Sequence, residues 1–353
     1  MAAITDRSRA VERIAQICHS STADAVGLRL AVLDEIRRVV EFDSFAWLLT
    51  DPETEVGSAP LADVPCLSEL PRLIRLKYLT AINRWTGMEK PVALLGASTR
   101  GHLDHSLVWR EILSRFGVID VASLVFRCRY GCWSFLDLWR STGGTSFTAL
   151  DADFLGAIAK PLTEALRRCQ ANTFSIAAPA TVRGGPAVLM LSPELDVRAQ
   201  TLETDDYLRL LIPPGADRRP IPAGAYNVAA QLLSVESGVD DHPPTARVHL
   251  AAGVWLTLRA ARIGTTLPAT DRDIAVTIEA STPAERMTLF GRACGLSARE
   301  LELFAHLVAG SDTHAIARQM FLSENTVQDH LKSIFLKTGT SNRRTLLAKT
   351  VGG

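Results

Sequence analysis

The 353-residue sequence lacks any long apolar run. A helix that spans a bilayer needs about 20 mostly apolar residues, and no stretch approaches even the roughly 18 that would suggest one. Met1 is likewise followed by no apolar segment of the length found in secretory signal peptides. We therefore expect no membrane association and a cytoplasmic location.

A net charge is also absent, because 38 basic and 38 acidic side chains balance. The balance is not uniform along the chain, since the stretch from Arg318 to Lys349 has a local excess of +4, six basic residues against two acidic ones. The basic residues are Arg318, Lys332, Lys337, Arg343, Arg344 and Lys349, and the acidic ones are Glu324 and Asp329. Such a patch favours contact with the phosphates of nucleic acid.

Signatures of catalysis are missing as well. The sequence has no glycine-rich phosphate loop ending in Lys-Ser or Lys-Thr, which excludes ATP binding of that type. It has no nucleophile elbow, no paired-carboxylate motif and no His-Glu-x-x-His helix. No N-terminal strand ends in the Asp pair of a phosphoacceptor receiver domain. We therefore expect no enzymatic activity and no cofactor.

Three potential metal ligands, His102, Asp104 and His105, fall within four residues. A metal site needs three or four converging ligands with supporting hydrogen bonds. A surface turn that opens a helix at Asp104 accounts for the same residues. We expect no metal here and keep the metal site as the alternative.

Two of the six cysteines are close in sequence. In a straight strand the sulfurs of Cys128 and Cys132 would be roughly 13 Å apart, too far for a disulfide. If Arg129-Tyr130-Gly131 forms a three-residue hairpin loop, the two cysteines lie opposite each other and can form a thiol switch. The alternative is that both are small buried hydrophobic residues. The other four, Cys18, Cys66, Cys169 and Cys294, show no spacing that adds ligands.

The length and a hydrophobic content of 47% favour two or three domains. After an N-terminal extension, 1–21, residues 22–176 indicate an α+β sensor domain. Its expected elements are a helix at 23–40, strands at 44–49, 121–126 and 133–139, and a long helix at 151–169. Four tryptophans, Trp85, Trp109, Trp133 and Trp139, either line a ligand pocket there or belong to its core.

The Gly/Pro-rich passage 177–186 predicts a linker to a second segment that extends to residue 283. Its expected elements are strands at 187–191, 245–250, 255–261 and 273–279, a helix capped by Asp205 and a helix at 223–235. Two helices with an antiparallel sheet of about five strands are similar to a PAS-like module, used for ligand sensing and dimerisation. A connector, 284–295, follows.

The tail carries the strongest local signals. Ser297 and Glu300 form a capping box that begins a first helix. Asp312 caps a second helix and Ser323 a third, which Gly339 ends before a short last helix. The inward-facing apolar stripe of the third helix consists of Val327, Leu331, Ile334 and Phe335. This pattern predicts a DNA-binding helix-turn-helix.

The tail resembles the DNA-binding domain of LuxR-type transcriptional regulators, without a gap from Leu296 to about Val351. The residues that carry the resemblance are Leu296, Arg299, Glu300, Gly310, Ile316, Ala317, Leu322, Ser323, Thr326, Val327, His330, Ile334, Lys337, Gly339 and Arg343. It implies a tetrahelical domain, 296–353, whose third helix enters the major groove.

The front of the chain resembles a second known module less specifically. The block from Ala97 to Glu111, the segment around Cys132-Trp133 and the closing helix look like the GAF-like sensory domain of long actinobacterial LuxR-type regulators, over about residues 22–168. The predicted fold class is therefore α+β, with GAF-like and PAS-like sensory domains followed by an all-α tetrahelical LuxR-type helix-turn-helix domain.

Three positions depart from the LuxR pattern. The family commonly has Glu at the position of Ala315, Leu at that of Thr338, and Lys or Arg at that of Gln328. The missing cation at 328 weakens contact with phosphate or guanine, and Asp329 adds a charge that phosphates repel. We expect ordinary DNA binding with an unusual base preference.

Helical geometry predicts which tail residues contact DNA. Asn325, Asp329 and Lys332 lie opposite the apolar stripe, with Gln328 on the flank, so we expect these four to read bases. We expect a second set to contact phosphates, as the resemblance implies for most of its members: Ser323, Thr326, His330, Lys337 and Arg343.

The predicted function is a sequence-specific transcriptional regulator whose sensory domains modulate DNA binding. Its expected partners are double-stranded DNA, a second copy of the chain, a small-molecule effector and RNA polymerase. Two alternatives remain open at this point: a small-molecule-processing enzyme localised by its tail, and a signalling adaptor that binds protein through the helical tail. Only the regulator predicts salt-sensitive, sequence-selective DNA binding.

Overall fold

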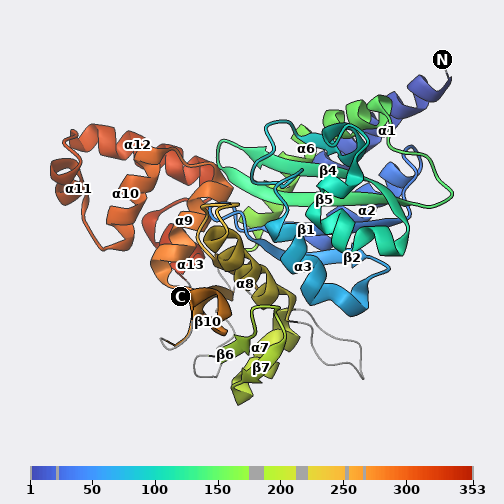
Figure 1. Cartoon of the computed structure of the whole chain (residues 1–353). Coiled ribbons are helices and arrows are strands. Elements are labelled where there is room, and N and C mark those ends of the chain that lie inside the picture. Colours follow the sequence, from blue (N-terminus) through green and yellow to red (C-terminus); the bar gives the residue numbers. More distant parts are fainter. Residues whose placement is uncertain are drawn as a thin grey trace. The chain divides into compact units, whose positions relative to one another are not determined.

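The computed structural model describes residues 2–20, 24–174, 187–211, 222–250, 254–264 and 268–351. The chain divides into two compact units (Figure 1). The first combines residues 1–166, 184–248 and 257–279, and the second combines 167–183, 249–256 and 280–353. The predicted linker at 177–186 and the predicted strand connection at 251–253 lie outside the described residues. Both predicted sensory segments contribute to the first unit, so their separation at 177 stays a prediction.

The first sheet of the first unit is antiparallel, with the strand order β2-β1-β5-β4-β3. Its strands are β1 (Ser44–Thr50), β2 (Gly57–Asp63), β3 (Val92–Leu94), β4 (Val118–Cys128) and β5 (Gly131–Ser141). The accompanying helices are α1 (Ala2–Ser20), α2 (Ala25–Arg37), α3 (Leu70–Leu79), α4 (Leu95–Ser98), α5 (Leu107–Glu111) and α6 (Ala149–Asn172). Single 3-10 turns span Leu67–Glu69, Leu103–His105 and Leu113–Phe116. The sequence predicted β1, β4, β5, α2 and α6, whereas α1, β2, α3 and β3 were missed.

The two faces of this sheet follow from its register. Ala46 pairs with Asp137 and Leu48 with Phe135, so these four side chains lie on one face. The opposite face carries buried apolar residues such as Trp47, which stacks on Phe126 with ring centroids 5.7 Å apart. Both faces of the sheet are therefore covered.

The second sheet is also five-stranded and has the order β7-β6-β10-β9-β8. Its strands are β6 (Ala187–Leu191), β7 (Val197–Gln200), β8 (Thr245–His249), β9 (Trp255–Arg262) and β10 (Ile274–Ala280). Two helices, α7 (Leu202–Leu211) and α8 (Ala223–Glu236), and a 3-10 turn at Ala269–Asp271 accompany it. The predicted cap at Asp205 is wrong, because α7 already begins at Leu202 and the Asp205 carboxylate pairs with Arg209 at 3.0 Å, one turn further along.

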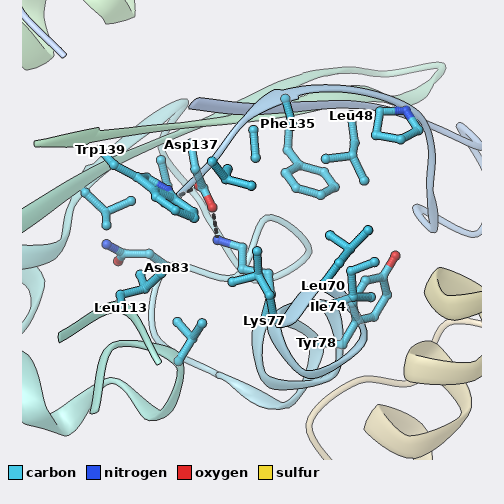
Figure 2. Close-up of a pocket in the computed structure, with 18 of the residues that line it drawn as sticks. Leu48, Leu70, Ile74, Lys77, Tyr78, Asn83, Leu113, Phe135, Asp137 and Trp139 are labelled. Atoms are coloured by element: carbon cyan, nitrogen blue, oxygen red, sulfur yellow. Dashed lines mark hydrogen bonds and ion pairs between the residues drawn. The ribbon is translucent and has the colours of Figure 1, made fainter. Parts of the chain in front are cut away.

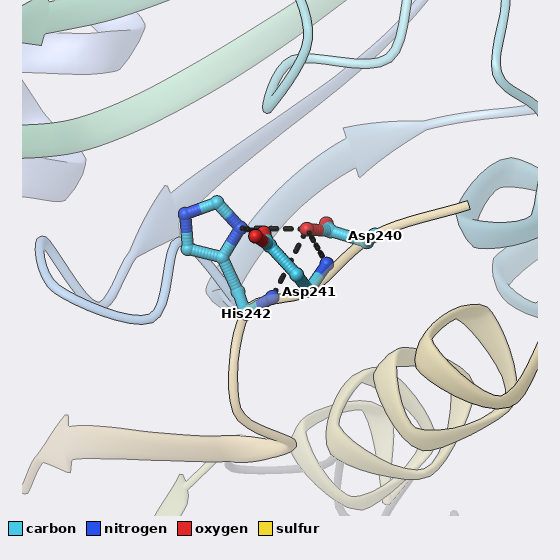
Figure 3. Close-up of side chains that lie close together, drawn as sticks. All are labelled: Asp240, Asp241 and His242. Carbon is cyan, nitrogen blue, oxygen red and sulfur yellow. Dashed lines mark hydrogen bonds and ion pairs between the residues drawn. The ribbon is translucent and has the colours of Figure 1, made fainter. Parts of the chain in front are cut away.

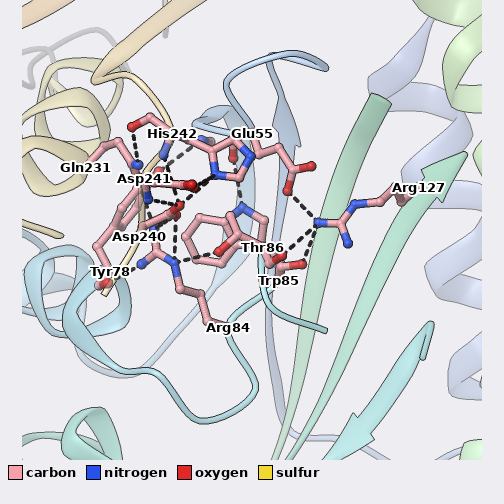
Figure 4. Close-up of polar contacts among 11 residues, drawn as sticks. Glu55, Tyr78, Arg84, Trp85, Thr86, Arg127, Gln231, Asp240, Asp241 and His242 are labelled. Carbon is pink, nitrogen blue, oxygen red and sulfur yellow. Dashed lines mark hydrogen bonds and ion pairs between the residues drawn. The ribbon is translucent and has the colours of Figure 1, made fainter. Parts of the chain in front are cut away.

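Two buried ion pairs within the first unit join segments beside the first sheet to segments beside the second. Arg247 of β8 donates to Asp51, which follows β1, at 2.7 Å. Burial alone would raise the pKa of Asp51, but the charge and hydrogen bonds of Arg247 outweigh it and hold the pKa below its ordinary value. Arg84, after α3, pairs with Asp240, after α8, at 2.5 Å, and also donates to Gln231 of α8 at 2.8 Å (Figure 4). Removing one partner of such a pair leaves the other charge buried without a counterion, which is strongly destabilising. These contacts therefore fix how the two sheets pack.

The hairpin between β4 and β5 differs by one residue from the prediction. Cys128 pairs with Gly131 and Arg127 with Cys132, so the two cysteines are not opposite each other. The indole nitrogen of Trp133 lies 3.3 Å from Cys128 Sγ, and burial raises the pKa of Cys132 to about 12. A disulfide of the geometry expected from a three-residue loop is therefore not formed.

The second unit is mainly helical. It contains α9 (Pro283–Cys294), α10 (Ala298–Val308), α11 (Thr313–Gln319), α12 (Glu324–Thr338) and α13 (Arg343–Val351). One buried cluster runs through these helices and includes Phe290, Leu303, Phe304, Val327 and Leu346. No helix in the described ranges is long and apolar enough to cross a membrane.

Candidate nucleic-acid interface

The predicted caps of the tail helices are confirmed. Ser297 accepts from the Glu300 backbone nitrogen at 3.3 Å, and the Glu300 carboxylate accepts from that of Ser297 at 2.6 Å, which is a complete capping box. Asp312 caps α11 at 2.7 Å and Ser323 caps α12 at 3.1 Å. Gly339 ends α12 at φ 62, in the left-handed region that glycine adopts at little cost.

The predicted base-reading side chains share the solvent-facing side of α12. Asn325, Gln328, Asp329 and Lys332 are all exposed, whereas Val327 and Leu331 are buried beneath them. Lys332 Nζ lies 3.0 Å from an Asp329 oxygen. Both side chains are about three-quarters exposed, so this ion pair contributes little to stability. Either side chain can leave the pair to contact a binding partner.

The predicted phosphate residues lie around the same helix, but several already have intramolecular partners. The Ser323 hydroxyl is used by the α12 cap and lies 2.9 Å from that of Thr326. Arg343 donates to the Thr313 hydroxyl at 2.5 Å, which ties the start of α13 to the start of α11. His330 is half-buried. Arg343 and Thr326 are also only partly exposed, and the contact of all five residues with phosphate stays a prediction.

Lys337 has the most elaborate contacts of the set. Its ammonium lies 2.8 and 2.7 Å from the two oxygens of Glu300, which also accepts from the Ser333 hydroxyl at 2.6 Å. Burial alone would raise the pKa of Glu300, but the hydrogen bonds from Lys337, Ser333 and Ser297 lower it to about 2. This carboxylate therefore fastens α12 to the beginning of α10.

Arg299 fixes the turn between α11 and α12. Its guanidinium donates to the carbonyl oxygen of Met320 and to Glu302. The next residue, Phe321, has φ 55 and is 94% exposed, an unusual conformation for a bulky side chain. The Arg-Glu pair that contributed to the resemblance thus positions the turn and α12.

Leu336 was missed by the sequence reasoning. It lies four residues after Lys332, on the exposed side of α12, and is 85% exposed. Its spacing from Lys332 was a signal that could have placed it there. An apolar side chain in this position suits the methyl group of thymine.

The residues that could bind a metal lie elsewhere than the alternative metal site considered from the sequence. Among the described residues, the set of potential metal ligands that comes together is Asp240, Asp241 and His242 (Figure 3), not His102 with its neighbours. Asp240 is already neutralised by Arg84 and accepts from His242 at 2.6 Å.

The four predicted tryptophans have different environments. Trp139 lines a cavity of the first unit (Figure 2), and Trp85 stacks on Phe135 at 4.1 Å. Trp109 donates to Val118, and Trp133 contacts a cysteine. Trp139 thus lines a cavity and the other three tryptophans have structural contacts, while ligand binding in this cavity stays a prediction.

One comparison with known proteins agrees with the geometry of the tail. Residues 295–349 match the family of bacterial regulatory proteins described as the luxR family. No curated protein matches the chain. Among solved structures, SdiA of Escherichia coli is similar at 11% identity and a TM-score of 0.35, over 99% of this chain and 98% of that one. The family match and the capped helix-turn-helix together identify a DNA-binding transcriptional regulator that carries a luxR-family domain at residues 295–349.

Proposed function

We propose that the protein is a cytoplasmic, homodimeric regulator, without enzymatic activity, whose first unit controls DNA binding by α12 in response to a small molecule. The observation that supports DNA reading best is the row of exposed polar side chains on α12 above a packed apolar stripe. Such a helix can lie in the major groove with its core contacts intact.

The exposed face offers complementary groups for base edges. Gln328 suits the N6 and N7 atoms of adenine, Asp329 accepts from cytosine N4, and Lys332 donates to guanine O6 and N7. Asn325 lies at the start of the same face. Each good pairing contributes about 1–3 kcal/mol of discrimination between bases.

The phosphate contacts are proposed for Ser323, Thr326, His330, Lys337 and Arg343. Lys337 is the informative case because its ammonium is shared with Glu300. If it moves to a phosphate on DNA, Lys337→Ala should weaken binding to all sequences alike and lower the salt slope by about one.

The test is DNA selection with the full chain, followed by binding at several salt concentrations. Gln328→Ala and Lys332→Ala should relax the preference at particular bases, and Asp329→Ala should raise non-specific affinity. Arg9→Ala, at an exposed position of α1, is the matched control and should change nothing. If the Gln328, Lys332, Asp329 and Lys337 variants all behave like the wild type, α12 is not the reading helix.

Assembly is proposed from the geometry of half-sites. A single helix-turn-helix contacts one half-site, so useful affinity at physiological salt needs two copies and a symmetric site. Sedimentation that shows a monomer both free and on selected DNA would contradict this. RNA polymerase is a further proposed partner, testable by transcription from a selected site.

Control by the first unit has its own test. A fragment that starts at Thr282, which caps α9, should bind DNA regardless of the conditions that change binding by the full chain. Identical behaviour of fragment and full chain under every condition would show that the first unit does not regulate.

A further inference from the structure

Arg286, in the second turn of α9, is a buried cation without a counterion. The residue is 8% exposed, and its guanidinium makes no hydrogen bond or ion pair with any residue that the structure describes. Burial lowers the pKa of Arg286, but an arginine side chain stays protonated in proteins. Because a buried charge is costly unless it is paired, Arg286 needs an anion beside it.

Solvent reaches part of this guanidinium. The Nε atom has almost no accessible surface, whereas Nη1 and Nη2, which also make no hydrogen bond within the described part of the chain, keep some. These two nitrogens are therefore the part of Arg286 that an anion from solution can contact. A guanidinium offers two parallel N–H donors to a carboxylate or phosphate group.

The residues around Arg286 supply no negative charge. The backbone nitrogen of Ser281 donates to the carbonyl oxygen of Trp255 at 2.8 Å, which places the start of α9 beside the start of β9. The rings of Trp255 and His249 lie 5.0 Å apart, centroid to centroid. Burial, together with the nearby charge of Arg286, lowers the pKa of His249 to about 4, so this ring is neutral at pH 7. Of these residues, Arg286 carries the charge.

The carboxylate side chains of the second unit are engaged elsewhere. Its sequence has twelve arginines and lysines but six aspartates and glutamates. Glu285, next to Arg286, accepts from the backbone nitrogen and the hydroxyl of Thr282 in the capping box of α9. The remaining five pair with a lysine, arginine or histidine side chain or cap a helix: Glu300, Glu302, Asp312, Glu324 and Asp329. No carboxylate side chain of this unit is therefore left for Arg286 among the described residues.

We propose that Arg286 anchors a binding site for a small carboxylate in the second unit. One guanidinium carries one positive charge, which a carboxylate neutralises, whereas phosphate at neutral pH carries up to two negative charges and would leave an excess next to Trp255. Side chains on a helix lean towards its N-terminus, where the helix dipole also favours an anion. The ligand is small, because most of the Arg286 side chain is covered.

Binding at Arg286 stabilises the second unit. Arg286 lies one helical turn before Phe290, which belongs to the same buried cluster as Leu303 of α10. A ligand that neutralises the buried charge removes an unfavourable contribution to the packing of α9. This site does not depend on how the first unit acts on DNA binding, so either proposal can fail without the other.

The first measurement is an NMR titration of the full chain with isotope-labelled arginine. Potassium acetate or potassium phosphate replaces potassium chloride at constant ionic strength and neutral pH. Acetate should shift one arginine Nε–H signal in a saturable way, and this signal should be missing from the spectrum of Arg286→Met. Absence of a saturable shift with acetate would overturn the proposal, and tighter binding of phosphate than of acetate would overturn recognition of a carboxylate.

A second measurement separates ligand binding from a structural role. Arg286→Met keeps an apolar stem and removes the charge, so without acetate it should be at least as stable as the wild type. Acetate at about ten times its dissociation constant should slow hydrogen exchange of the protected α9 amides about tenfold in the wild type and leave Arg286→Met unchanged. Arg344→Met, at an exposed position of α13, is the matched control and should respond to acetate like the wild type. Faster exchange of α9 in Arg286→Met without acetate, or an acetate response in that variant equal to that of the wild type, would contradict the site.

Discussion

Replacing Glu300 with Gln tests whether one buried carboxylate holds the helix-turn-helix together. Its pKa falls from the ordinary 4.5 to about 2, because hydrogen bonds from Lys337, Ser333 and Ser297 outweigh the cost of burial. A fall of this size corresponds to about 3 kcal/mol of folded-state stability at neutral pH. Since the folded pKa is the lower one, this stability is present above the unfolded pKa and is lost as pH falls from about 5 towards 2. Glu300→Gln keeps the shape and removes the charge, so it should lose up to this amount at pH 7.

Hydrogen exchange on the full chain gives the appropriate readout, because it reports opening of α10 and α12 separately from the first unit. A loss of about 3 kcal/mol accelerates exchange of their protected amides about a hundredfold. Peptides from α6 within residues 149–166 of the first unit are the internal control and should not change.

A double-mutant cycle with Lys337→Met identifies the partner. Both single variants remove the same interaction, so the double variant should cost clearly less than the sum of the two. Costs that add within about 0.5 kcal/mol would show that the two side chains do not interact in solution. A Glu300→Gln variant as stable as the wild type would refute the reasoning itself.

Three further predictions concern other buried or strained groups. The hydrogen bond to Asp240 raises the pKa of His242, so the stabilising effect of this contact should be complete below about pH 6.5 and decline as the pH rises further. Thermal unfolding between pH 6 and 8.5 should show this dependence in the wild type and not in His242→Gln. Arg247→Met leaves the Asp51 carboxylate buried without its cation and should lower the free energy of unfolding by about 3–5 kcal/mol. Urea unfolding of the first unit measures this loss, and an unchanged midpoint would mean that water reaches the carboxylate. Phe321→Gly should raise the melting temperature of the second unit slightly, because glycine adopts this positive φ without the cost of about 1–2 kcal/mol and the lost side chain is exposed. A lower melting temperature would show that Phe321 packs against the protein in solution.

The elements that could be predicted from sequence are those specified within one or two turns. Ser297, Asp312 and Ser323 each cap a helix through a backbone nitrogen three residues away, so these caps follow directly from the residue types. β2 was missed because its sequence GSAPLAD has no alternation of apolar and polar residues. Asp205 is a residue type that commonly caps helices, but the helix already begins at Leu202. Residue propensity alone cannot decide which of these two positions starts the helix.

The cavity could not be predicted because it depends on contacts between distant segments. Trp139 was among the candidates, yet Lys77, Asp137 and Asn227 meet only after α3 and α8 have packed beside the sheet. The α12 face was predictable because helical periodicity alone orients it. What periodicity did not reveal is that Lys337 is paired with Glu300, a residue far from it in sequence.

The close packing of α9 against α10 has a consequence for transplanting the DNA reader into another protein. A Cβ added at Gly291 would lie 2.1 Å from Leu301, and Phe290 belongs to the same buried cluster as Leu303. The segment that matches the luxR family begins only at residue 295, so a chimera joined there would leave this cluster without Phe290. A junction just upstream of Thr282 keeps the five helices α9 to α13 and the cap of the first one, but it removes Phe174 and Trp255, which belong to the same cluster. The core of the DNA-binding unit therefore includes more of this chain than the part that matches the luxR family.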